Sequence, residues 1–464
     1  MRSDQGPRKG CPSRGKETRM NMKCVYIYTI GCQMNVYDSE MFKKVLRPLG
    51  YIPTDEVEDA DLVIVNTCTV RKKAEEKAFS FLGRMRALKK KNPELIVAIG
   101  GCVAQQEGAA ILRRMPYVDL VFGTRAYARL AAMVKAFEYD RIPVVDVEMT
   151  MGVADEIPTP AMDAEVEVSR FVTIMRGCDN FCSYCIVPYV RGREESRDPD
   201  AIVQEVTELV ARGAREITLL GQNVNSYGKK EDLCDFPELL RRVSDVEDLE
   251  RIRFATSHPK DLSPGLVEAY RDLPKLCNHI HLPVQSGSNA VLKKMNRKYT
   301  REDYMQRIER LKEVRPDIAL TSDMIVGFPG ETEEDFAETL DLVRAVGFSG
   351  IFAFKYSDRP NAPAVGYEGK VSEEDKSRRL AALLDLEKEL SEKRNLSYAG
   401  TTVEVLVEGR KEGKGGLQWT GRSSCNRVVN FTAAKEGSDA NLVGKVVPVY
   451  IEEGLPHSLR GVLV

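Results

Sequence analysis

Strand-like apolar runs alternate with helix-like stretches along most of this 464-residue chain. In residues 24–145 the runs VYIYTI, DLVIVNTC and ELIVAIGGC are each followed by a stretch of helical character, near 38–48, 71–90 and 105–114. A β-α-β-α rhythm of this kind is typical of a parallel sheet with helices on its faces. The sequence therefore predicts a doubly wound parallel α/β domain over 24–145.

The alternation resumes after an acidic, irregular stretch. Residues 146–167 hold two prolines and show no clear period, which predicts a linker. From 168 to 398, about six strand-like runs alternate with helices, and this number favours a partial (β/α) barrel over a complete eightfold one. The last helix is expected to begin after Ser372 as its N-cap, because an i, i+3, i+4 apolar stripe follows.

The two ends of the chain differ from the middle. Residues 399–464 consist of short β-branched runs between Gly-rich turns, which predicts a small all-β barrel. Residues 1–23 are rich in Arg and Lys and poor in apolar side chains, so we expect a disordered basic tail that is not a secretory signal. No apolar run reaches the roughly 18–20 residues of a membrane span. We therefore expect a cytoplasmic α/β protein without a membrane partner.

Six of the eleven cysteines fall into two sets of three, and one set lies in a single loop. Cys178, Cys182 and Cys185 follow the predicted strand FVTIMRG, at the end of a barrel strand where such folds carry their functional groups. Clustered cysteines without a secretory signal more often bind metal or do chemistry than form disulfides. A closed structural zinc site would need a fourth ligand, and the nearest histidine is His258. Three thiolates suit a four-iron cluster, with one iron left open for a substrate.

The segment MRGCDNFCSYCIVPYVRGR resembles the signature of radical S-adenosylmethionine (SAM) enzymes. The resemblance implies that SAM chelates the open iron and that an electron from the cluster releases a 5′-deoxyadenosyl radical. By the same resemblance, GQNVNSYG, HLPVQSGS and DMIVGFPGET are expected to contact SAM at successive strand ends. The candidate SAM residues are Gln222, Asn223, Gln285, Ser286 and Gly327. Taken singly, each such segment is more often only a turn.

The other three cysteines, Cys32, Cys68 and Cys102, are spread along the chain, and each follows a predicted strand. Because parallel strands end at a common edge, these thiols can converge, although separate buried thiols are an equal alternative. Their contexts GCQMNVYDSE, VNTCTVR and GGCVAQ resemble the N-terminal domain of the methylthiotransferase family. The resemblance implies a second, auxiliary four-iron cluster that binds a sulfur species, sulfide or persulfide. It also implies that Gln33 and Asn35 lie near this cluster and that Asp38, Ser39 and Glu40 begin the next helix.

The resemblance extends from residue 24 to about 455, and the C-terminal barrel resembles a TRAM domain, an RNA-binding module. RFATSHP, HLPVQSGSNAVLKKMNRKYT and GRSSCNRVVNF place it nearest the tRNA-modifying, MiaB-type branch. The implied reaction is methylthiolation at C2 of N6-isopentenyladenosine beside the anticodon, with two SAM molecules per turnover. Implied partners are the tRNA anticodon stem-loop, an electron donor such as flavodoxin or ferredoxin, and iron–sulfur cluster assembly proteins.

Local patches must carry any RNA binding, because the net charge of the chain is only −2. Arg191 and Arg193 follow the cysteine loop, while Arg422 and Arg427 lie in the C-terminal barrel segment with Trp419 and Phe431. Arginines for phosphates and aromatic faces for splayed bases suit an anticodon loop. For any single arginine, a solvated charged face is the alternative.

Three functions remain open from the sequence. The first is the tRNA methylthiotransferase described above. The second is a methylthiotransferase that acts on threonylcarbamoyladenosine in tRNA or on a ribosomal protein, and the segments NRVVNF and TSHP count against it. The third is a non-catalytic iron–sulfur or RNA-binding protein, which the intact SAM-site segments count against.

Overall fold

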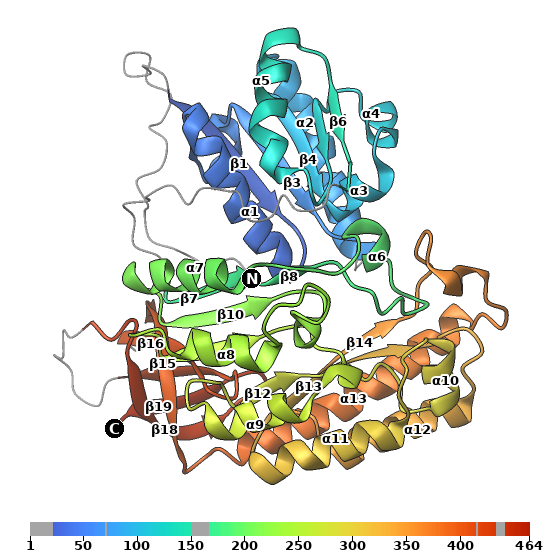
Figure 1. The fold of residues 1–464 in the computed structure, drawn as a ribbon, viewed down its shortest axis with the longest axis vertical. Coiled ribbons are helices and arrows are strands. Elements are labelled where there is room, and N and C mark those ends of the chain that lie inside the picture. Colours follow the sequence, from blue (N-terminus) through green and yellow to red (C-terminus); the bar gives the residue numbers. More distant parts are fainter. Residues whose placement is uncertain (1–21, 70–71, 150–166, 414–415, 433–440) are drawn as a thin grey trace. The chain divides into compact units, whose positions relative to one another are not determined.

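The computed structural model describes residues 22–69, 72–149, 167–413, 416–432 and 441–464. These residues form two compact units (Figure 1). One unit contains Met1–Met162 together with Ile186–Arg193, and the other contains Asp163–Cys185 together with Glu194–Val464. Most of the predicted tail at 1–23 and of the predicted linker at 146–167 lies outside the described residues. The short segment Ile186–Arg193 thus belongs with the first unit, although its position in the sequence suggests the second.

The first unit is built on a six-stranded parallel sheet with the order β2-β1-β3-β4-β5-β6. Its strands are β1 (Lys23–Thr29), β2 (Tyr51–Pro53), β3 (Leu62–Thr67), β4 (Ile96–Gly101), β5 (Leu120–Phe122) and β6 (Val144–Asp146). Its helices are α1 (Gln33–Leu46), α2 (Lys72–Lys91), α3 (Cys102–Glu107), α4 (Ala110–Arg114) and α5 (Leu130–Asp140). Every residue of β3 and β4 is buried, as expected for central strands covered by helices on both faces. The predicted doubly wound α/β fold is confirmed.

Two helix boundaries in this unit differ from the sequence prediction. α1 begins at Gln33, with Cys32 as its N-cap, so Asp38, Ser39 and Glu40 lie inside the helix and do not begin it. The early start follows from Asn35, whose side-chain Oδ1 accepts a hydrogen bond from the Cys32 amide at 3.2 Å and satisfies a free helix-end donor. The predicted helix at 105–114 is two helices, α3 and α4, because Gly108 has a φ of +51° and ends the first.

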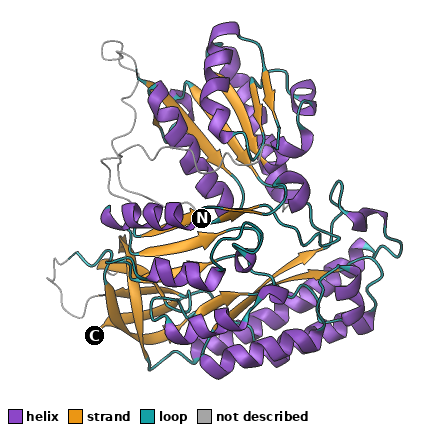
Figure 2. Ribbon diagram, in the orientation of Figure 1, coloured by secondary structure: helices purple, strands orange, loops and turns teal. Residues whose placement is uncertain are grey.

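The second unit contains the partial barrel that the sequence predicted. Six parallel strands form two three-stranded sheets with the orders β11-β10-β7 and β12-β13-β14 (Figure 2). The strands are β7 (Ser169–Thr173), β10 (Glu216–Leu220), β11 (Arg251–Phe254), β12 (His279–His281), β13 (Ala319–Val326) and β14 (Gly350–Lys355). The helices between and after them are α7 (Pro199–Ala211), α8 (Phe236–Ser244), α9 (Pro264–Asp272), α10 (Asn289–Lys294), α11 (Arg301–Val314), α12 (Glu333–Val346) and α13 (Glu373–Leu396). A single apolar core joins both sheets to these helices.

Short elements connect this barrel to the cysteine loop. The predicted strand FVTIMRG is divided into β7 and β8 (Met175–Arg176), and β8 pairs with β9 (Glu195–Ser196). Between them lie the loop that carries Cys178, Cys182 and Cys185 and the one-turn helix α6 (Val187–Val190). The cysteine loop therefore leaves and rejoins the barrel through one small antiparallel pair.

The C-terminal segment forms a closed five-stranded barrel with the order β15-β16-β17-β19-β18. Its strands are β15 (Thr402–Gly413), β16 (Gly416–Ser423), β17 (Val428–Thr432), β18 (Val446–Gly454) and β19 (Leu459–Leu463). The helix α13 leads into this barrel and begins, as predicted, at Ser372, whose hydroxyl accepts from the Asp375 amide. At the other end of α13, the Asn395 side-chain amide donates to the Leu455 carbonyl at 2.6 Å.

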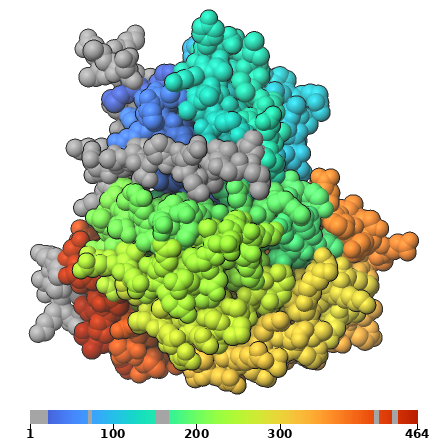
Figure 3. Space-filling model, in the orientation of Figure 1, coloured from blue at the N-terminus to red at the C-terminus, as the bar shows by residue number. Residues whose placement is uncertain are grey.

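Two arginines of β11 fasten the closed barrel to the partial barrel. Figure 3 shows the C-terminal residues, in red, against the green and yellow residues of the partial barrel. The Arg253 guanidinium donates to the Glu216 carboxylate at 2.8 Å and to the carbonyls of Ser423 and Ser424 at 2.8 and 2.9 Å. Arg251 donates to the Arg422 carbonyl at 2.5 Å. The RFATSHP segment thus begins with Arg253, which holds the two barrels together, and Arg251 lies two residues before it.

Among the helices that the structure describes, none is long and apolar enough to cross a membrane.

Candidate functional site

The cysteine set of the first unit, Cys32, Cys68 and Cys102, lies at the carboxyl edge of the parallel sheet. Cys32 follows β1, Cys68 follows β3 and Cys102 begins α3 directly after β4, and these three strands are neighbours. The loops approach closely, since a Cβ added at Gly31 would lie 2.7 Å from the Cys68 Cβ. Gly101 has a φ of +90° and a Cβ there would lie 2.4 Å from the Thr67 carbonyl oxygen, so the turn before Cys102 requires glycine. The fold therefore gathers three thiols more than thirty residues apart in sequence.

The environment of these thiols favours the iron-binding thiolate form at Cys32 but not at Cys102. A hydrogen bond with Cys68, together with the nearby charge of Arg191, outweighs burial and lowers the pKa of Cys32 to about 6. Burial raises the pKa of Cys102, and the Arg191 charge acts against that rise. Cys32 is exposed at this edge, whereas Cys68 and Cys102 are buried.

Arg191 lies beside these thiols as a buried cation. Its guanidinium donates to the Asp38 carboxylate at 2.8 Å, and the two side chains are only 5% and 4% exposed. Loss of either side chain would leave the other charge buried without a partner, which is strongly destabilising. The sequence suggested Arg191 as a tRNA contact, but its burial favours a role at the thiols instead.

Within the first unit, side chains of Thr124 and Arg125 hold the segment that carries Arg191. The Thr124 hydroxyl donates to the Val190 carbonyl at 2.6 Å, and Arg125 donates to the carbonyls of Arg191 and Arg193. The side chain of Val190 packs against Cys102. Arg193 itself is exposed, and its role as an RNA contact stays a prediction.

An asparagine pair orients the loops that carry Cys32 and Cys68. The Asn35 Oδ1 accepts from the amide and the thiol of Cys32, at 3.2 and 3.4 Å. The Asn35 Nδ2 donates to the Asn66 Oδ1 and to the Thr67 carbonyl, both at 3.0 Å. Asn35 is therefore near the thiols, where the resemblance placed it, but it is buried and bonds to protein groups. Gln33 is exposed at the same edge. Sequence reasoning missed Asn66, although the segment VNTC sets it two residues before Cys68.

The second cysteine set is wrapped in one loop of unit 2. The Cys185 amide donates to the Cys182 carbonyl at 2.9 Å, and Phe181 takes a φ of +45° to complete the turn. The Asn180 side-chain amide donates to the Cys178 sulfur at 3.4 Å, and the Arg297 guanidinium donates to the Cys182 sulfur at 3.4 Å. N–H donors of this kind stabilise thiolates. Neither donor was named from the sequence, although Arg297 lies in the segment KKMNRKYT that carried the resemblance.

Across the described ranges, no three His, Cys, Asp or Glu side chains are grouped as the ligands of one metal ion would be. In a four-iron cluster, each thiolate binds a different iron. Both cysteine sets have a buried arginine nearby, Arg191 in unit 1 and Arg297 in unit 2, which offsets part of the negative charge of a thiolate-bound cluster.

Gln222 and Asn223, two of the expected SAM residues, follow β10. The Gln222 Oε1 accepts from the Gly177 amide at 2.5 Å, next to Cys178. The Asn223 Nδ2 donates to the Asp261 carboxylate at 2.8 Å, while its Oδ1 is buried with no hydrogen-bond partner among the residues that the structure describes. A buried acceptor without a partner is costly, so a ligand that donates a hydrogen bond would be favoured here. An amino group of SAM meets that requirement.

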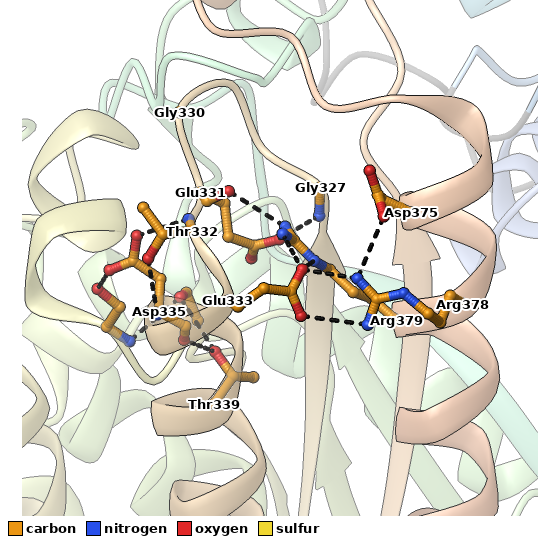
Figure 4. A network of polar contacts seen from close by, with 12 residues as sticks. Gly327, Gly330, Glu331, Thr332, Glu333, Asp335, Thr339, Asp375, Arg378 and Arg379 are labelled. Carbon is orange, nitrogen blue, oxygen red and sulfur yellow. Dashed lines mark hydrogen bonds and ion pairs between the residues drawn. The ribbon is translucent and has the colours of Figure 1, made fainter.

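The other three expected SAM residues lie in two turns, and Figure 4 shows the one that contains Gly327 beside the side chains of α12 and α13. Gln285 takes a φ of +78°, and Ser286 is fully buried with its hydroxyl 3.3 Å from that of Thr339. Gly327 takes a φ of +71°, and its amide donates to the Glu331 carboxylate at 2.6 Å.

The candidate RNA residues of the closed barrel differ in their exposure to solvent. Arg422 is partly exposed and its guanidinium lies 3.4 Å from Glu408. Arg427 contacts the Asn395 side chain and lies over the Tyr398 ring. Trp419 and Phe431 are buried in the barrel core, so the prediction that they stack on bases is wrong. Alternation along β16 and β17 turns these aromatic residues inward.

Comparison with known families matches the three parts of the chain separately. Residues 24–123 match the Uncharacterized protein family UPF0004, residues 172–343 match the Radical SAM superfamily, and residues 396–464 match the TRAM domain.

Named relatives match almost the whole chain. A tRNA-2-methylthio-N(6)-dimethylallyladenosine synthase from Desulfosudis oleivorans is 52% identical and covers 96% of this chain and 97% of its own length. A synthase of the same name from Geobacter sulfurreducens is 49% identical over 95% of this chain and 98% of its own length. Among solved structures, the radical SAM methyltransferase TsrM from Kitasatospora setae is similar in fold. Its TM-score is 0.53 at 14% identity, with 85% of this chain and 79% of that chain covered.

Proposed function

Because the chain belongs to the family of the tRNA-2-methylthio-N(6)-dimethylallyladenosine synthases, we propose that it is a radical SAM methylthiotransferase acting on tRNA. The reaction replaces the C2 hydrogen of N6-isopentenyladenosine, next to the anticodon, with a methylthio group. The product is 2-methylthio-N6-isopentenyladenosine. The observation that carries the proposal is the near-complete match to relatives of this name, together with two separate cysteine sets in the matched domains.

The chemistry of the substrate explains why such a protein would use radicals. The adenine C2–H bond is unactivated and offers neither a good leaving group nor a nucleophile. A cluster held by Cys178, Cys182 and Cys185, with SAM bound to it, would supply the radical chemistry that this bond requires. Asn180 and Arg297 would stabilise those thiolates, and Gln222 would fix the loop through the Gly177 amide.

The auxiliary site is proposed to hold the sulfur. Cys32, Cys68 and Cys102 would hold a second four-iron cluster, with sulfide or persulfide as the sulfur source and a second SAM as the methyl donor. The buried Arg191–Asp38 pair supports this assignment, since a cation beside three thiols offsets their charge. The exposed position of Cys32 and Gln33 leaves this edge of the unit open to a substrate.

The partners follow from the substrate and the electron demand. The TRAM domain is proposed to bind the tRNA anticodon stem-loop, with Arg422 and Arg193 as candidate phosphate contacts. A low-potential donor such as flavodoxin or ferredoxin would supply electrons, and iron–sulfur assembly proteins would load the clusters. We place the reaction in the cytoplasm, where tRNA is modified.

Mass spectrometry of tRNA nucleosides tests the proposal. A strain without the gene should lack 2-methylthio-N6-isopentenyladenosine and accumulate N6-isopentenyladenosine, and the gene in trans should restore the product. Accumulation of unmodified threonylcarbamoyladenosine instead would identify the alternative nucleoside. The reconstituted, dithionite-reduced protein should also release 5′-deoxyadenosine from SAM, which a non-catalytic iron–sulfur protein would not do.

A further inference from the structure

The turn that follows β13 is held in place by one buried carboxylate. Residues 327–332 connect β13 to α12, and the Glu331 side chain folds back to accept the Gly327 amide at 2.6 Å. Glu331 is only 1% exposed, and burial raises the pKa of its carboxyl group. A buried carboxylate needs a cation or several donors to remain charged. The conformation of this turn therefore depends on what pairs with Glu331.

That partner is Arg379, which comes from α13 and lies far from the turn in sequence (Figure 4). The Arg379 Nη1 donates to the Glu331 carboxylate at 2.7 Å and to the Glu331 carbonyl at 3.2 Å. Its Nη2 donates to Glu333, the first residue of α12, at 2.6 Å. One guanidinium thus bonds both the end of the turn and the start of the following helix, which a planar fork can do and a lysine cannot.

α13 also sets the position of Gly327 directly. A Cβ at Gly327 would lie 2.2 Å from the Cγ of Lys376, one helical turn before Arg379. The helix is therefore in close contact with one side of the turn. Because the far end of α13 is hydrogen-bonded into the closed barrel through Asn395, the helix that supports the turn is itself fixed at both ends.

We propose that Arg379 is a positioning residue for SAM: through Glu331 it holds the Gly327 turn in the one conformation that accepts the adenosine part of SAM. This inference rests on the proposed function and on the family resemblance, which implies that Gly327 contacts SAM. Arg379 does not touch SAM. It acts by keeping Glu331 ionised and aimed at the Gly327 amide, so that the turn is formed before SAM arrives.

The chain offers a matched control in the neighbouring arginine. Arg378 also bonds Glu333, at 2.7 Å, and contacts Asp375, but its side chain is 54% exposed and, in the part of the chain that the structure describes, forms no hydrogen bond or ion pair with Glu331. Arg378→Met and Arg379→Met remove the same chemical group from adjacent positions on one helix. Only Arg379→Met should disturb the Gly327 turn.

Equilibrium dialysis of SAM against the cluster-loaded, unreduced protein measures the effect. We expect Arg379→Met to raise the Kd for SAM at least about tenfold, the size expected for loss of a charged hydrogen bond, and Arg378→Met to leave it unchanged. At saturating SAM, the dithionite-driven release of 5′-deoxyadenosine should keep its maximal rate. Arg379→Lys keeps the positive charge but loses the planar guanidinium, so its Kd for SAM should lie between those of the native protein and Arg379→Met.

Two outcomes would overturn the inference. The first is an unchanged Kd for SAM in Arg379→Met with a lowered unfolding temperature, because that describes a purely structural pair. The second is an equal rise of the Kd in Arg378→Met. If Arg379→Met fails to retain iron, the Kd for SAM of Arg379→Lys becomes the test. The inference then requires that this Kd exceed the Kd of the native protein. A native protein that releases no 5′-deoxyadenosine would contradict the proposed function, whereas the dialysis result would still test the turn.

Discussion

Removal of Arg253 should undock and destabilise the C-terminal barrel. This side chain is buried and joins three groups: the Glu216 carboxylate at 2.8 Å and the carbonyls of Ser423 and Ser424 at 2.8 and 2.9 Å. The change Arg253→Met keeps most of the apolar stem and removes only the guanidinium. Glu216 would then retain the Ser169 hydroxyl at 2.6 Å but lose its bonded cation.

The expected loss of stability follows from the unpaired carboxylate. Removing one partner of a buried ion pair typically costs about 3–5 kcal/mol. The neighbouring change Arg251→Met provides the control, because Arg251 bonds only carbonyl oxygens, of Arg422 and Glu404, and should cost about 1–3 kcal/mol. The double change Glu216→Gln with Arg253→Met should recover about 1–3 kcal/mol relative to Arg253→Met, since no charge is left unpaired.

The chain contains a built-in reporter for this measurement. Its single tryptophan, Trp419, is buried in the core of the closed barrel, so fluorescence during urea unfolding follows this barrel. We expect Arg253→Met to lower the unfolding free energy and to weaken tRNA binding, while SAM cleavage without tRNA continues. A loss below about 1 kcal/mol, or equal losses for Arg251→Met and Arg253→Met, would refute the reasoning that the ion pair fastens the two barrels.

Three further predictions concern the cysteine sites. Replacing any one of Cys32, Cys68 and Cys102 with Ala should abolish methylthio product but leave 5′-deoxyadenosine release intact, and loss of that release would contradict separate roles for the two sets. Replacing any one of Cys178, Cys182 and Cys185 with Ala should stop both activities, so retained turnover would disprove the cluster assignment. Arg191→Met should leave Asp38 buried and unpaired and cost about 3–5 kcal/mol; iron analysis should then show loss of about half the iron, because one of two four-iron clusters is affected. Iron content equal to that of the native protein would contradict a role for Arg191 at the auxiliary thiols.

Much of the fold was predictable because its signals are local. Apolar runs and helical periodicity predicted the doubly wound sheet, the partial barrel and the closed barrel, and Ser372 was recognised as an N-cap from the residues that follow it. Boundaries were less predictable where a single side chain decides them. α1 starts five residues before the stretch predicted near 38, because the Asn35 side chain caps the turn at Cys32.

The side chains that support the cysteine loops and the Gly327 turn were not predictable in this way. Asn66, Arg297 and Arg379 act on loops that are far from them in sequence, and no periodic pattern reports which loop a side chain will reach. The same limit explains the error at Trp419 and Phe431. Alternation along a β-strand places these aromatic residues on one face of the sheet. In this short segment the sequence alone did not show whether that face points into the barrel core or to solvent.

The sequence by itself determined which residues carry the chemistry. The spacing of Cys178, Cys182 and Cys185 within one loop is a local property, since a few intervening residues limit how far apart three thiols can lie. Only the tertiary structure decided how Arg191 is used. Arg193 follows two residues later, and the two arginines suggest a surface that faces RNA, yet the chain folds so that Arg191 pairs with Asp38 beside Cys32, Cys68 and Cys102. Burial makes the Arg191 charge part of the site at Cys32, Cys68 and Cys102. Because burial depends on contacts between segments that are distant in sequence, the sequence alone did not show it.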